Sequence, residues 1–370
     1  MKTVKLGTLG EIFIGLTYHP DDVSENGTVV LRSSNIQDGQ LVFSDTIRVN
    51  CKVRENLFVK ANDILMCSRN GSAKLVGKCT LIPELEENMT FGAFMTIIRT
   101  SHNAYLQHFF NSNAFRTQIK GSATTTINQI TRKMLDDIDV PVFDTDKEKQ
   151  IIKILDELTN LITLRKEQIK KLDELVKARF IEMFGDPILN QHGWRKEALE
   201  ANATLLNGRA YKQDELLDSG KYPVLRVGNF FSNRGWYYSD LELDGDKYCD
   251  NGDLLYAWSA SFGPQIWNGG KVIYHYHIWK VLVGEAYNKQ FLCKLLEYAT
   301  ETLMGDTHGI AMMHLTKSGM EKTAFIVPPI EFQEQFATFV EQINKSKLSI
   351  QQSLEKLETL KKSLMQQYFG

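Results

Sequence analysis

The chain contains one long internal repeat. Residues 171–185 read KLDELVKARFIEMFG and residues 356–370 read KLETLKKSLMQQYFG, so six of fifteen positions are identical at a constant offset of 185. A period this long is far above the roughly 20–50 residues of solenoid repeats, and it predicts two domain-sized halves. Shorter matches precede it in the same order: Gly15-x-x-Tyr18 with Gly208-x-x-Tyr211, Leu31-Arg32-x-x-Asn35 with Leu225-Arg226-x-x-Asn229, Asp63-Ile64-Leu65 with Asp253-Leu254-Leu255, and Ile130-Thr131 with Leu315-Thr316.

Each half ends in a segment with the period of a coiled coil. From position 151 to 183, mostly apolar residues recur at alternating steps of four and three, and the same register holds from 336 to 368. Gly185-Asp186-Pro187 ends the first segment, because glycine tolerates positive φ and proline lacks an N–H donor. We therefore expect long helices over 146–185 and 331–370 that pack on each other. An ordinary amphipathic helix on a domain surface is the alternative.

Four positions of this predicted seam are basic: Arg165, Arg179, Lys347 and Lys361. Polar residues at seam positions cost stability, but they can fix the register of a helix pair. The alternative is that these long side chains extend to solvent at the edge of the seam. The sequence leaves both interpretations open.

The segments before the helices, 1–145 and 186–330, carry short runs of β-branched and aromatic residues. Residues 28–31, 94–98, 272–276 and 277–283 are examples, and turn pairs such as Asn70-Gly71 and Asn251-Gly252 separate such runs. Helical stretches are fewer, residues 287–302 being one. The fold class that follows is α+β: two strand-rich domains, 1–145 and 186–330, each followed by a long helix.

Composition narrows the class of protein. The sequence has no apolar run near 18 residues and no apolar signal core after Met1, so we expect no membrane span and no secretion. Five widely spaced cysteines without a C-x-x-C pair fit a cytoplasmic protein rather than a disulfide framework or zinc site. The formal net charge is −2, and residues 1–145 and 186–330 carry 0 and −3. A nonspecific polyanion binder is thereby disfavoured.

Motifs of common enzymes are missing. There is no G-x-x-x-x-G-K-[ST] nucleotide loop, and no F-x-G-x-G with Asn-Pro-Pro or Asp-Pro-Pro, which would indicate an adenine methyltransferase. Pro20-Asp21 has no [DE]-x-K partner of a nuclease within thirty residues. His275-x-His277 lacks an identifiable third ligand, so we expect a packed pair and no metal site. We expect no catalytic residues in this chain.

Polar turns at matching places in both halves are more suggestive. Arg and Asn side chains can read guanine and adenine edges, whereas Ser, Thr and backbone N–H groups hold phosphates. Taken singly, each such residue is also ordinary turn chemistry; the matched set favours DNA contact. The candidate residues are Arg32, Ser33, Asn35, Ser68, Arg69, Asn70, Thr124, Thr125, Thr131, Arg226, Asn229, Ser259, Ser261, Gln265, Asn268, His277, Thr316 and Lys317.

On these features the chain resembles the specificity subunits of type I restriction-modification systems over its whole length. The resemblance is carried by two variable segments each followed by a long helix, and by two strings of the second half. One is GDLLYAWSASFG at 252–263, continuing to Ile266-Trp267-Asn268-Gly269. The other is His314-Leu315-Thr316-Lys317, which leads into IVPPIE at 326–331. The first half matches less closely, having Arg69 where the second half has Ser259.

The resemblance implies two target recognition domains in a pseudo-twofold repeat, separated by two helices that form an antiparallel coiled coil. Each domain would read one half of a split sequence in double-stranded DNA. The chain would bind no cofactor. Two modification subunits would carry S-adenosylmethionine and methylate adenine, and restriction subunits would use ATP.

Two other functions stay open at this point. One is a coiled-coil adaptor or scaffold protein without a DNA role, because duplication and turn chemistry do not exclude it. The other is a self-contained DNA modification enzyme with an unrecognised active site. DNA binding together with a modification subunit separates the first from the resemblance, and methyl transfer by the chain alone separates the second.

Overall fold

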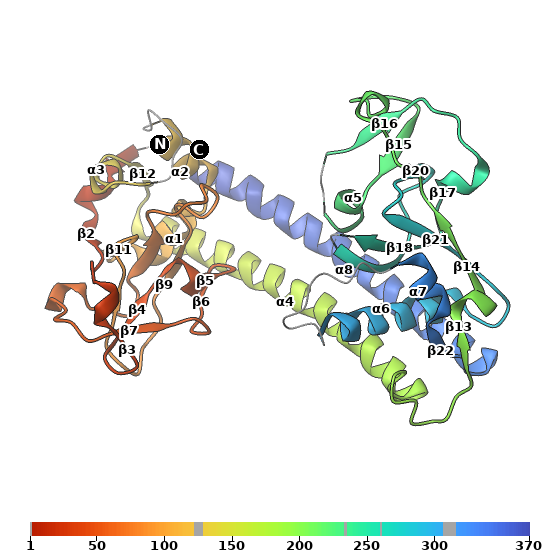
Figure 1. The fold of residues 1–370 in the computed structure, drawn as a ribbon. Coiled ribbons are helices and arrows are strands. Elements are labelled where there is room, and N and C mark those ends of the chain that lie inside the picture. Colours follow the sequence, from red (N-terminus) through yellow and green to blue (C-terminus); the bar gives the residue numbers. More distant parts are fainter. Residues whose placement is uncertain (1, 122–128, 233–234, 260, 306–315) are drawn as a thin grey trace. The chain divides into compact units, whose positions relative to one another are not determined.

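In the computed structural model, residues 2–121, 129–232, 235–259, 261–305 and 316–370 are described (Figure 1). The chain forms two compact units. The first unit comprises residues 1–166 and 352–370, and the second comprises residues 167–351. Both contain helices and strands, which confirms the predicted α+β class. The candidate residues Thr124 and Thr125 lie outside the described residues.

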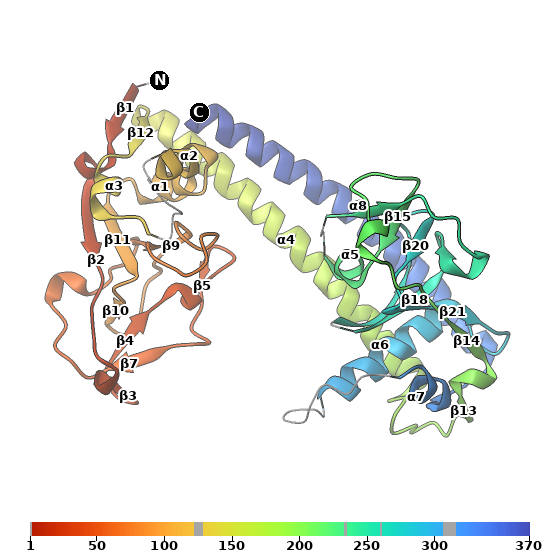
Figure 2. The same cartoon turned by 45° about the horizontal axis from the view of Figure 1, so that its top comes forward.

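The first unit contains two four-stranded sheets. Their strand orders are β2-β11-β8-β9 and β10-β4-β7-β3, and two-stranded pairs β1-β12 and β5-β6 complete the unit. Figure 2 shows β1 and β12 side by side near the last turns of α8. The elements before the first long helix are β1 (Lys2–Lys5), β2 (Gly10–Ile14), β3 (Val23–Ser24), β4 (Thr28–Leu31), β5 (Ile36–Gln37), β6 (Gln40–Leu41), β7 (Ile47–Val49), β8 (Ile64–Cys67), β9 (Cys79–Leu81), β10 (Met89–Phe91), β11 (Met95–Thr100), α1 (Asn103–Phe110), α2 (Asn113–Gly121), α3 (Arg132–Asp136) and β12 (Asp139–Val142).

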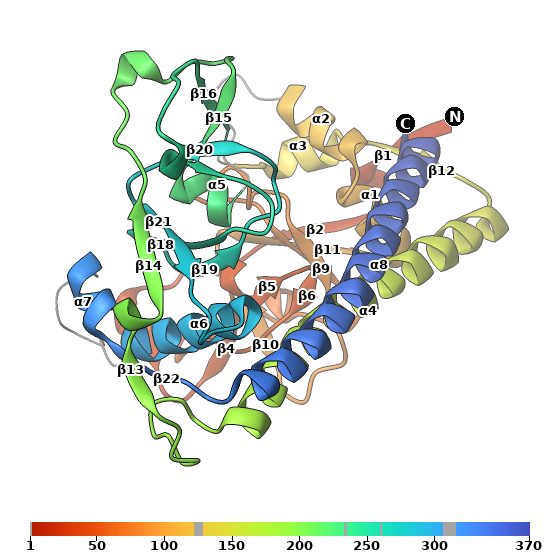
Figure 3. The ribbon, with the colours of Figure 1, turned by 90° about the vertical axis from the view of Figure 1, so that its right-hand side faces the viewer.

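The second unit repeats this plan. Its sheets have the orders β14-β21-β18-β19 and β16-β15-β20-β17, and β13 pairs with β22 as β1 pairs with β12. Figure 3 shows β14, β18 and β21 above α6. The elements are β13 (Lys196–Ala198), β14 (Ala203–Asn207), β15 (Tyr222–Leu225), α5 (Val227–Phe231), β16 (Tyr237–Ser239), β17 (Tyr248–Cys249), β18 (Leu254–Ser259), β19 (Ser261–Ile266), β20 (Val272–Tyr274), β21 (Ile278–Val283), α6 (Lys289–Gly305), α7 (Lys317–Lys322) and β22 (Ala324–Ile326).

The two long helices are α4 (Thr145–Phe184) and α8 (Ile330–Phe369), within one residue of the predicted bounds. The Asp144 carboxylate accepts a hydrogen bond from Lys147 N at 2.9 Å and caps the start of α4. At the end of α4, Gly185 has φ +71°, and Asp186 Oδ1 accepts from Ile188 N at 2.8 Å. Glycine is therefore required where the chain leaves the helix.

The predicted seam is confirmed, because each of its twenty positions is buried or half-buried. Within the second unit, Lys347 Nζ of α8 pairs with Asp173 Oδ1 of α4 at 2.5 Å. Within the first unit, Lys361 Nζ of α8 donates to Thr159 Oγ1 of α4 at 2.7 Å. Residues 159 and 173 are two heptads apart, as are 347 and 361, so the helices pair antiparallel in one register.

The repeated Phe-Gly ends of the two helices have a common structural role. Phe184 of α4 lies in the core of the second unit, 4.6 Å from the Phe291 ring. Phe369 of α8 lies in the core of the first unit, 5.8 Å from the Phe109 ring. Each long helix thus starts in one unit and contributes its last aromatic residue to the core of the other. Burying such a ring is worth about 1.5–3 kcal/mol.

Candidate nucleic-acid interface

In each unit the chain crosses from one sheet to the other through three residues. The first junction, residues 92–94 (Gly-Ala-Phe), joins β10 to β11. The second junction, residues 275–277 (His-Tyr-His), joins β20 to β21. The sequence pattern placed Phe94, His275, Tyr276 and His277 within strands, whereas β20 ends at Tyr274 and the next strands start at Met95 and Ile278.

Five of the backbone hydrogen bonds at each junction correspond one to one between the units. All ten have N···O distances between 2.7 and 3.2 Å. The same backbone geometry therefore presents Gly-Ala-Phe in one unit and His-Tyr-His in the other. In the first unit, the bonds run from Gly15 N to Met95 O, Leu16 N to Phe91 O, Gly92 N to Leu31 O, Met95 N to Gly92 O and Ser68 N to Phe94 O. In the second unit, the matching bonds run in the same order from Gly208 N to Ile278 O, Arg209 N to Tyr274 O, His275 N to Leu225 O, Ile278 N to His275 O and Trp258 N to His277 O.

The strand before each junction runs parallel to an earlier strand. Val29–Leu31 of β4 pair with Met89–Phe91 of β10, and Val224 and Leu225 of β15 pair with Ile273 and Tyr274 of β20. The matched Leu31 and Leu225 of the sequence repeat thus fix the junctions through their carbonyl oxygens. The repeat in sequence reflects a repeat in backbone hydrogen bonding.

The first junction borders a groove of about 770 Å³. Tyr18 and Val23 contribute apolar surface to it, and Arg32 and Ser33 contribute polar groups. Phe94 also lines the groove and is 57% exposed. Such a surface, apolar with a few polar groups, suits the edge of a base.

Two arginines near this groove differ in their contacts: Arg32 lines the groove, whereas Arg69 lies against the Phe94 ring. Arg32 Nη2 pairs with Asp45 Oδ1 at 2.7 Å, so its charge is balanced within the protein. Arg69 is exposed, and its guanidinium lies 5.2 Å from the centre of the Phe94 ring. Asn70 Nδ2 donates to Ser33 Oγ at 3.1 Å and ties the two candidate segments together. The structure thus brings Arg32, Ser33, Arg69 and Asn70 to one side of the unit.

Three other candidates of the first unit have structural roles. Asn35 is fully buried, and its side chain accepts from Arg32 N at 2.8 Å and donates to Val42 O and Asp45 O at 3.0 Å. Ser68 is buried and donates through Oγ to Phe94 O at 3.1 Å. Thr131 caps α3 by accepting from Met134 N at 3.2 Å. We therefore correct the expectation of DNA contact for the buried Asn35 and Ser68.

In the second unit the predicted turn at 258–263 is a strand hairpin. β18 extends through Ser259 and β19 starts at Ser261, with Ser259 paired to Ser261. Gln265 consequently lies on a strand opposite Leu255 and not beside a turn. Asn268 is exposed beyond the end of β19. The hairpin was not predicted because the small residues Ser-Ala-Ser interrupt the alternation of apolar and polar residues that indicates a strand.

Aromatic rings surround the second junction. The Trp258 and His277 ring centres are 5.0 Å apart, and Trp258 Nε1 donates to Tyr276 O at 2.8 Å. Burial, with the nearby His277 and Arg226 as smaller causes, lowers the pKa of His275 to about 4. Burial also lowers the pKa of His277. Both imidazoles are thus neutral at pH 7 and able to accept as well as donate hydrogen bonds.

The remaining candidates of the second unit are held by the protein. Arg226 lies 4.2 Å from the centre of the Tyr237 ring, and Asn229 Oδ1 accepts from Arg226 N at 3.4 Å at the start of α5. Thr316 caps α7 by accepting from Gly319 N at 3.1 Å, as Thr131 caps α3. Lys317 pairs with Glu321 at 3.4 Å. The matched Thr131 and Thr316 of the repeat are therefore explained by helix capping.

Sequence reasoning missed the aromatic residues of the junctions. Phe94 and Tyr276 are exposed, and neither was among the candidates. Their signal in the sequence is an aromatic residue at the boundary of an apolar run, which resembles the end of a strand. The hydrogen bonding that the two junctions share depends on contacts between distant segments.

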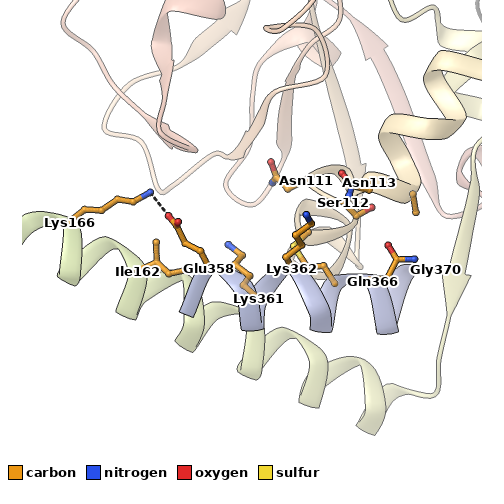
Figure 4. Close-up of a pocket in the computed structure, with 12 residues that line it drawn as sticks. Asn111, Ser112, Asn113, Ile162, Lys166, Glu358, Lys361, Lys362, Gln366 and Gly370 are labelled. Atoms are coloured by element: carbon orange, nitrogen blue, oxygen red, sulfur yellow. Dashed lines mark ion pairs between the residues drawn. The ribbon is translucent and has the colours of Figure 1, made fainter. Parts of the chain in front are cut away.

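A second hollow, of about 350 Å³, lies in the first unit between the start of α2 and the helix pair (Figure 4). Figure 4 shows Lys361 and Lys362 extending from α8 toward the loop that carries Asn111 and Ser112. Lys166 Nζ pairs with Glu358 Oε1 at 3.1 Å across the two helices. Burial, and then the charge of Lys166, lowers the pKa of Lys361. The ion pair between Lys166 and Glu358 therefore connects α4 with α8 at this hollow.

Two further features bear on the class of protein. Within the described ranges, no three His, Cys, Asp or Glu side chains gather as a metal site. The His275 and His277 ring centres lie 4.8 Å apart without such a third group among the residues that the structure describes. None of the helices seen in this part of the chain is both long and apolar enough to cross a bilayer.

The chain is similar to proteins of known class. The specificity subunit of the type I restriction enzyme EcoKI of Escherichia coli K12 is 26% identical over 282 residues, which are 68% of this chain and 60% of that protein. The StySPI specificity subunit of Salmonella potsdam is 26% identical over 250 residues, 62% of this chain and 53% of that protein. The chain thus spans about half to three fifths of these relatives.

Two solved structures are similar over the whole chain, which supports the fold. The crystal structure of a type I restriction-modification system S subunit from M. genitalium has a TM-score of 0.59 at 13% identity and covers 100% of this chain and 96% of that chain. A solved structure that concerns complex assembly and conformational transition of the type I R-M system has a TM-score of 0.54 at 16% identity. It covers 100% of this chain and 97% of that chain.

The family model of the type I restriction modification DNA specificity domain matches twice, once in each half. The matched segments are residues 1–174 and 193–361. Together they include the strands of both units and most of both long helices. On this evidence the chain belongs to the family of type I restriction modification DNA specificity domain proteins.

Proposed function

We propose that this chain is the DNA-recognition subunit of a type I restriction-modification complex and reads a two-part target. Residues 1–145 and 186–330 are the two target recognition domains, and the helices 146–185 and 331–370 connect them. The observation that carries the proposal is the pair of junctions, in which one backbone geometry presents different side chains. Such an arrangement allows two related readers to recognise different bases on one duplex.

The chain itself carries no catalytic residues in this proposal. Two modification subunits supply S-adenosylmethionine and adenine methylation, restriction subunits supply ATP-driven activities, and the complex works in the cytoplasm. The specificity-subunit names of the relatives support this division of labour. The near-zero formal net charge of −2 supports partners that contribute much of the phosphate contact.

Methylation-site sequencing tests the proposal. The chain is produced with its modification subunit in a host that lacks other adenine methylation, and host DNA is sequenced for methylated adenines. We expect one motif with two specified parts and an unspecified spacer. A complex that methylates without a sequence motif contradicts the proposal. Methyl transfer by the purified chain alone indicates a self-contained enzyme, and a complex that does not bind duplex DNA indicates an adaptor.

A further inference from the structure

We propose that Phe94 contacts the 5-methyl group of a thymine in the half-site read by the first unit. This inference rests on the proposed function and adds the chemistry of one contact. Thymine is the base that presents a methyl group in the major groove, and apolar side chains recognise it there. The first support comes from the way in which the protein holds the ring.

The backbone of Phe94 is fixed although its ring is exposed. Its carbonyl oxygen accepts hydrogen bonds from Ser68 N at 3.0 Å, Arg69 N at 3.1 Å and Ser68 Oγ at 3.1 Å. The ring nevertheless remains 57% exposed. A large apolar ring that faces solvent from a fixed backbone and lines an apolar groove is a feature of a binding surface rather than of a core.

The surroundings of the ring match one edge of a base pair. Val23, 48% exposed, and Tyr18 extend the apolar wall of the groove that Phe94 lines. The Arg69 guanidinium lies 5.2 Å from the ring centre, and no ion pair holds it among the described residues. The site thus combines an apolar wall with a positive charge that forms no ion pair with the residues that the structure describes. DNA supplies both a methyl group and negative phosphates to such a site.

The second unit provides an internal comparison. His277 occupies the place of Phe94, since Trp258 N donates to His277 O as Ser68 N donates to Phe94 O, both at 3.0 Å. A neutral imidazole offers hydrogen bonds to base edges and has no purely apolar face of this kind. Sensitivity to a thymine methyl group at this position should therefore be confined to one half-site.

The experiment removes the methyl group from the DNA and the ring from the protein. Once the target is known, each thymine of either half-site is replaced singly by deoxyuridine, and binding of the assembled complex is measured by competition. One replacement in the first unit's half-site should weaken binding about four-fold, or ~0.8 kcal/mol, the value of one buried methyl-sized group. Phe94→Ala should weaken binding to the thymine duplex and abolish the difference between the two duplexes.

Two control variants distinguish this contact from a general loss of apolar surface. Phe43→Ala, which removes a ring that is 45% exposed and does not line the groove, should leave binding unchanged. Phe94→Leu should retain part of the methyl effect. The inference is wrong if deoxyuridine costs the same with Phe94→Ala as with the wild type, or if no thymine of that half-site is sensitive. A complex with no sequence motif would instead contradict the proposed function itself.

Discussion

Two glycines show how closely the backbones approach at the junctions. A Cβ atom on Gly15 would lie 2.1 Å from Gly92 O, and one on Gly208 would lie 2.4 Å from His275 O. Both distances are far below van der Waals contact, and the opposing atoms are backbone, which cannot rotate away. Glycine is thus required here for space, which explains why Gly15 and Gly208 match in the sequence repeat.

Gly15→Ala should therefore destabilise the first unit by roughly 2 kcal/mol or more, the range of an overpacked interior. The measurement is the urea-unfolding midpoint. Gly71→Ala is a matched control from the same unit, because no atom lies within 4 Å of its added Cβ. Equal midpoints for the two variants would contradict the close approach.

The buried imidazole of the second junction gives a pH dependence. The pKa of His275 is lowered to about 4 in the folded chain, against about 6.5 in an unfolded one. Between these values the unfolded chain binds the extra proton, so stability falls as the pH is lowered from about 6.5 to about 4. His275→Gln should flatten this part of the profile. The free energy of unfolding by urea is measured for both proteins at pH 7, 5.5 and 4.5. If stability falls with pH equally in the variant and the wild type, His275 is not the group responsible.

At the scale of elements, polar contacts link the two long helices at the basic positions of their mostly apolar seam. Lys347 pairs with Asp173, Lys361 donates to Thr159, and Arg179 lies 6.0 Å from the Phe339 ring of the other helix. These residues contact the facing helix instead of only reaching solvent. The structure thus supports the register interpretation of these seam residues.

Lys361→Leu should raise the stability of the helix pair by roughly 1 kcal/mol. Burial lowers the pKa of Lys361, which means that its charge is unfavourable where it lies. Lys362→Leu is the adjacent control, because Lys362 is exposed and outside the seam. Thermal unfolding of the two variants decides: the expected order is Lys361→Leu above wild type, with Lys362→Leu close to wild type. A drop in stability for Lys361→Leu would show that the Thr159 contact outweighs the charge burial.

Sequence patterns predicted the elements well where the determining contacts are local. The seam of α4 and α8 follows from a repeat of 3.5 residues, and β4 (Thr28–Leu31) was predicted at its observed bounds. The junctions were not predicted, because they depend on the parallel pairing of β4 with β10 some 60 residues later. Asn35 was misassigned for a related reason: its polarity suggested a binding residue, but its partners lie at Val42 and Asp45.

For the whole molecule, charge sets an expectation for affinity. Residues 1–145 carry 15 basic and 15 acidic side chains, and residues 186–330 carry 14 and 17. Phosphate neutralisation usually supplies a large share of DNA affinity. If the proposed function holds, the chain alone should therefore bind its target weakly and gain affinity with modification subunits. Fluorescence anisotropy at about 150 mM salt tests this, and tight specific binding by the isolated chain would contradict it.

The two halves should also change specificity independently. Replacing residues 188–313 with the matching segment of a relative exchanges the second junction and its sheets but leaves Gly15, Phe94 and the first unit intact. One part of the target should then change. The spacer should stay the same, because α4 and α8 run through both units and neither is altered.

Methylation-site sequencing of cells that carry this exchange measures both outcomes at once. A narrower exchange, of residues 275–277 alone, tests whether the side chains of the junction are enough to change the specificity or whether the adjoining sheets must be exchanged as well. Loss of a base contact should cost ~1–3 kcal/mol and relax one position, whereas loss of a phosphate contact should weaken all sequences alike. If both parts of the target changed, or the spacer lengthened, the halves would not be separate readers, and the matched hydrogen bonds would serve folding alone.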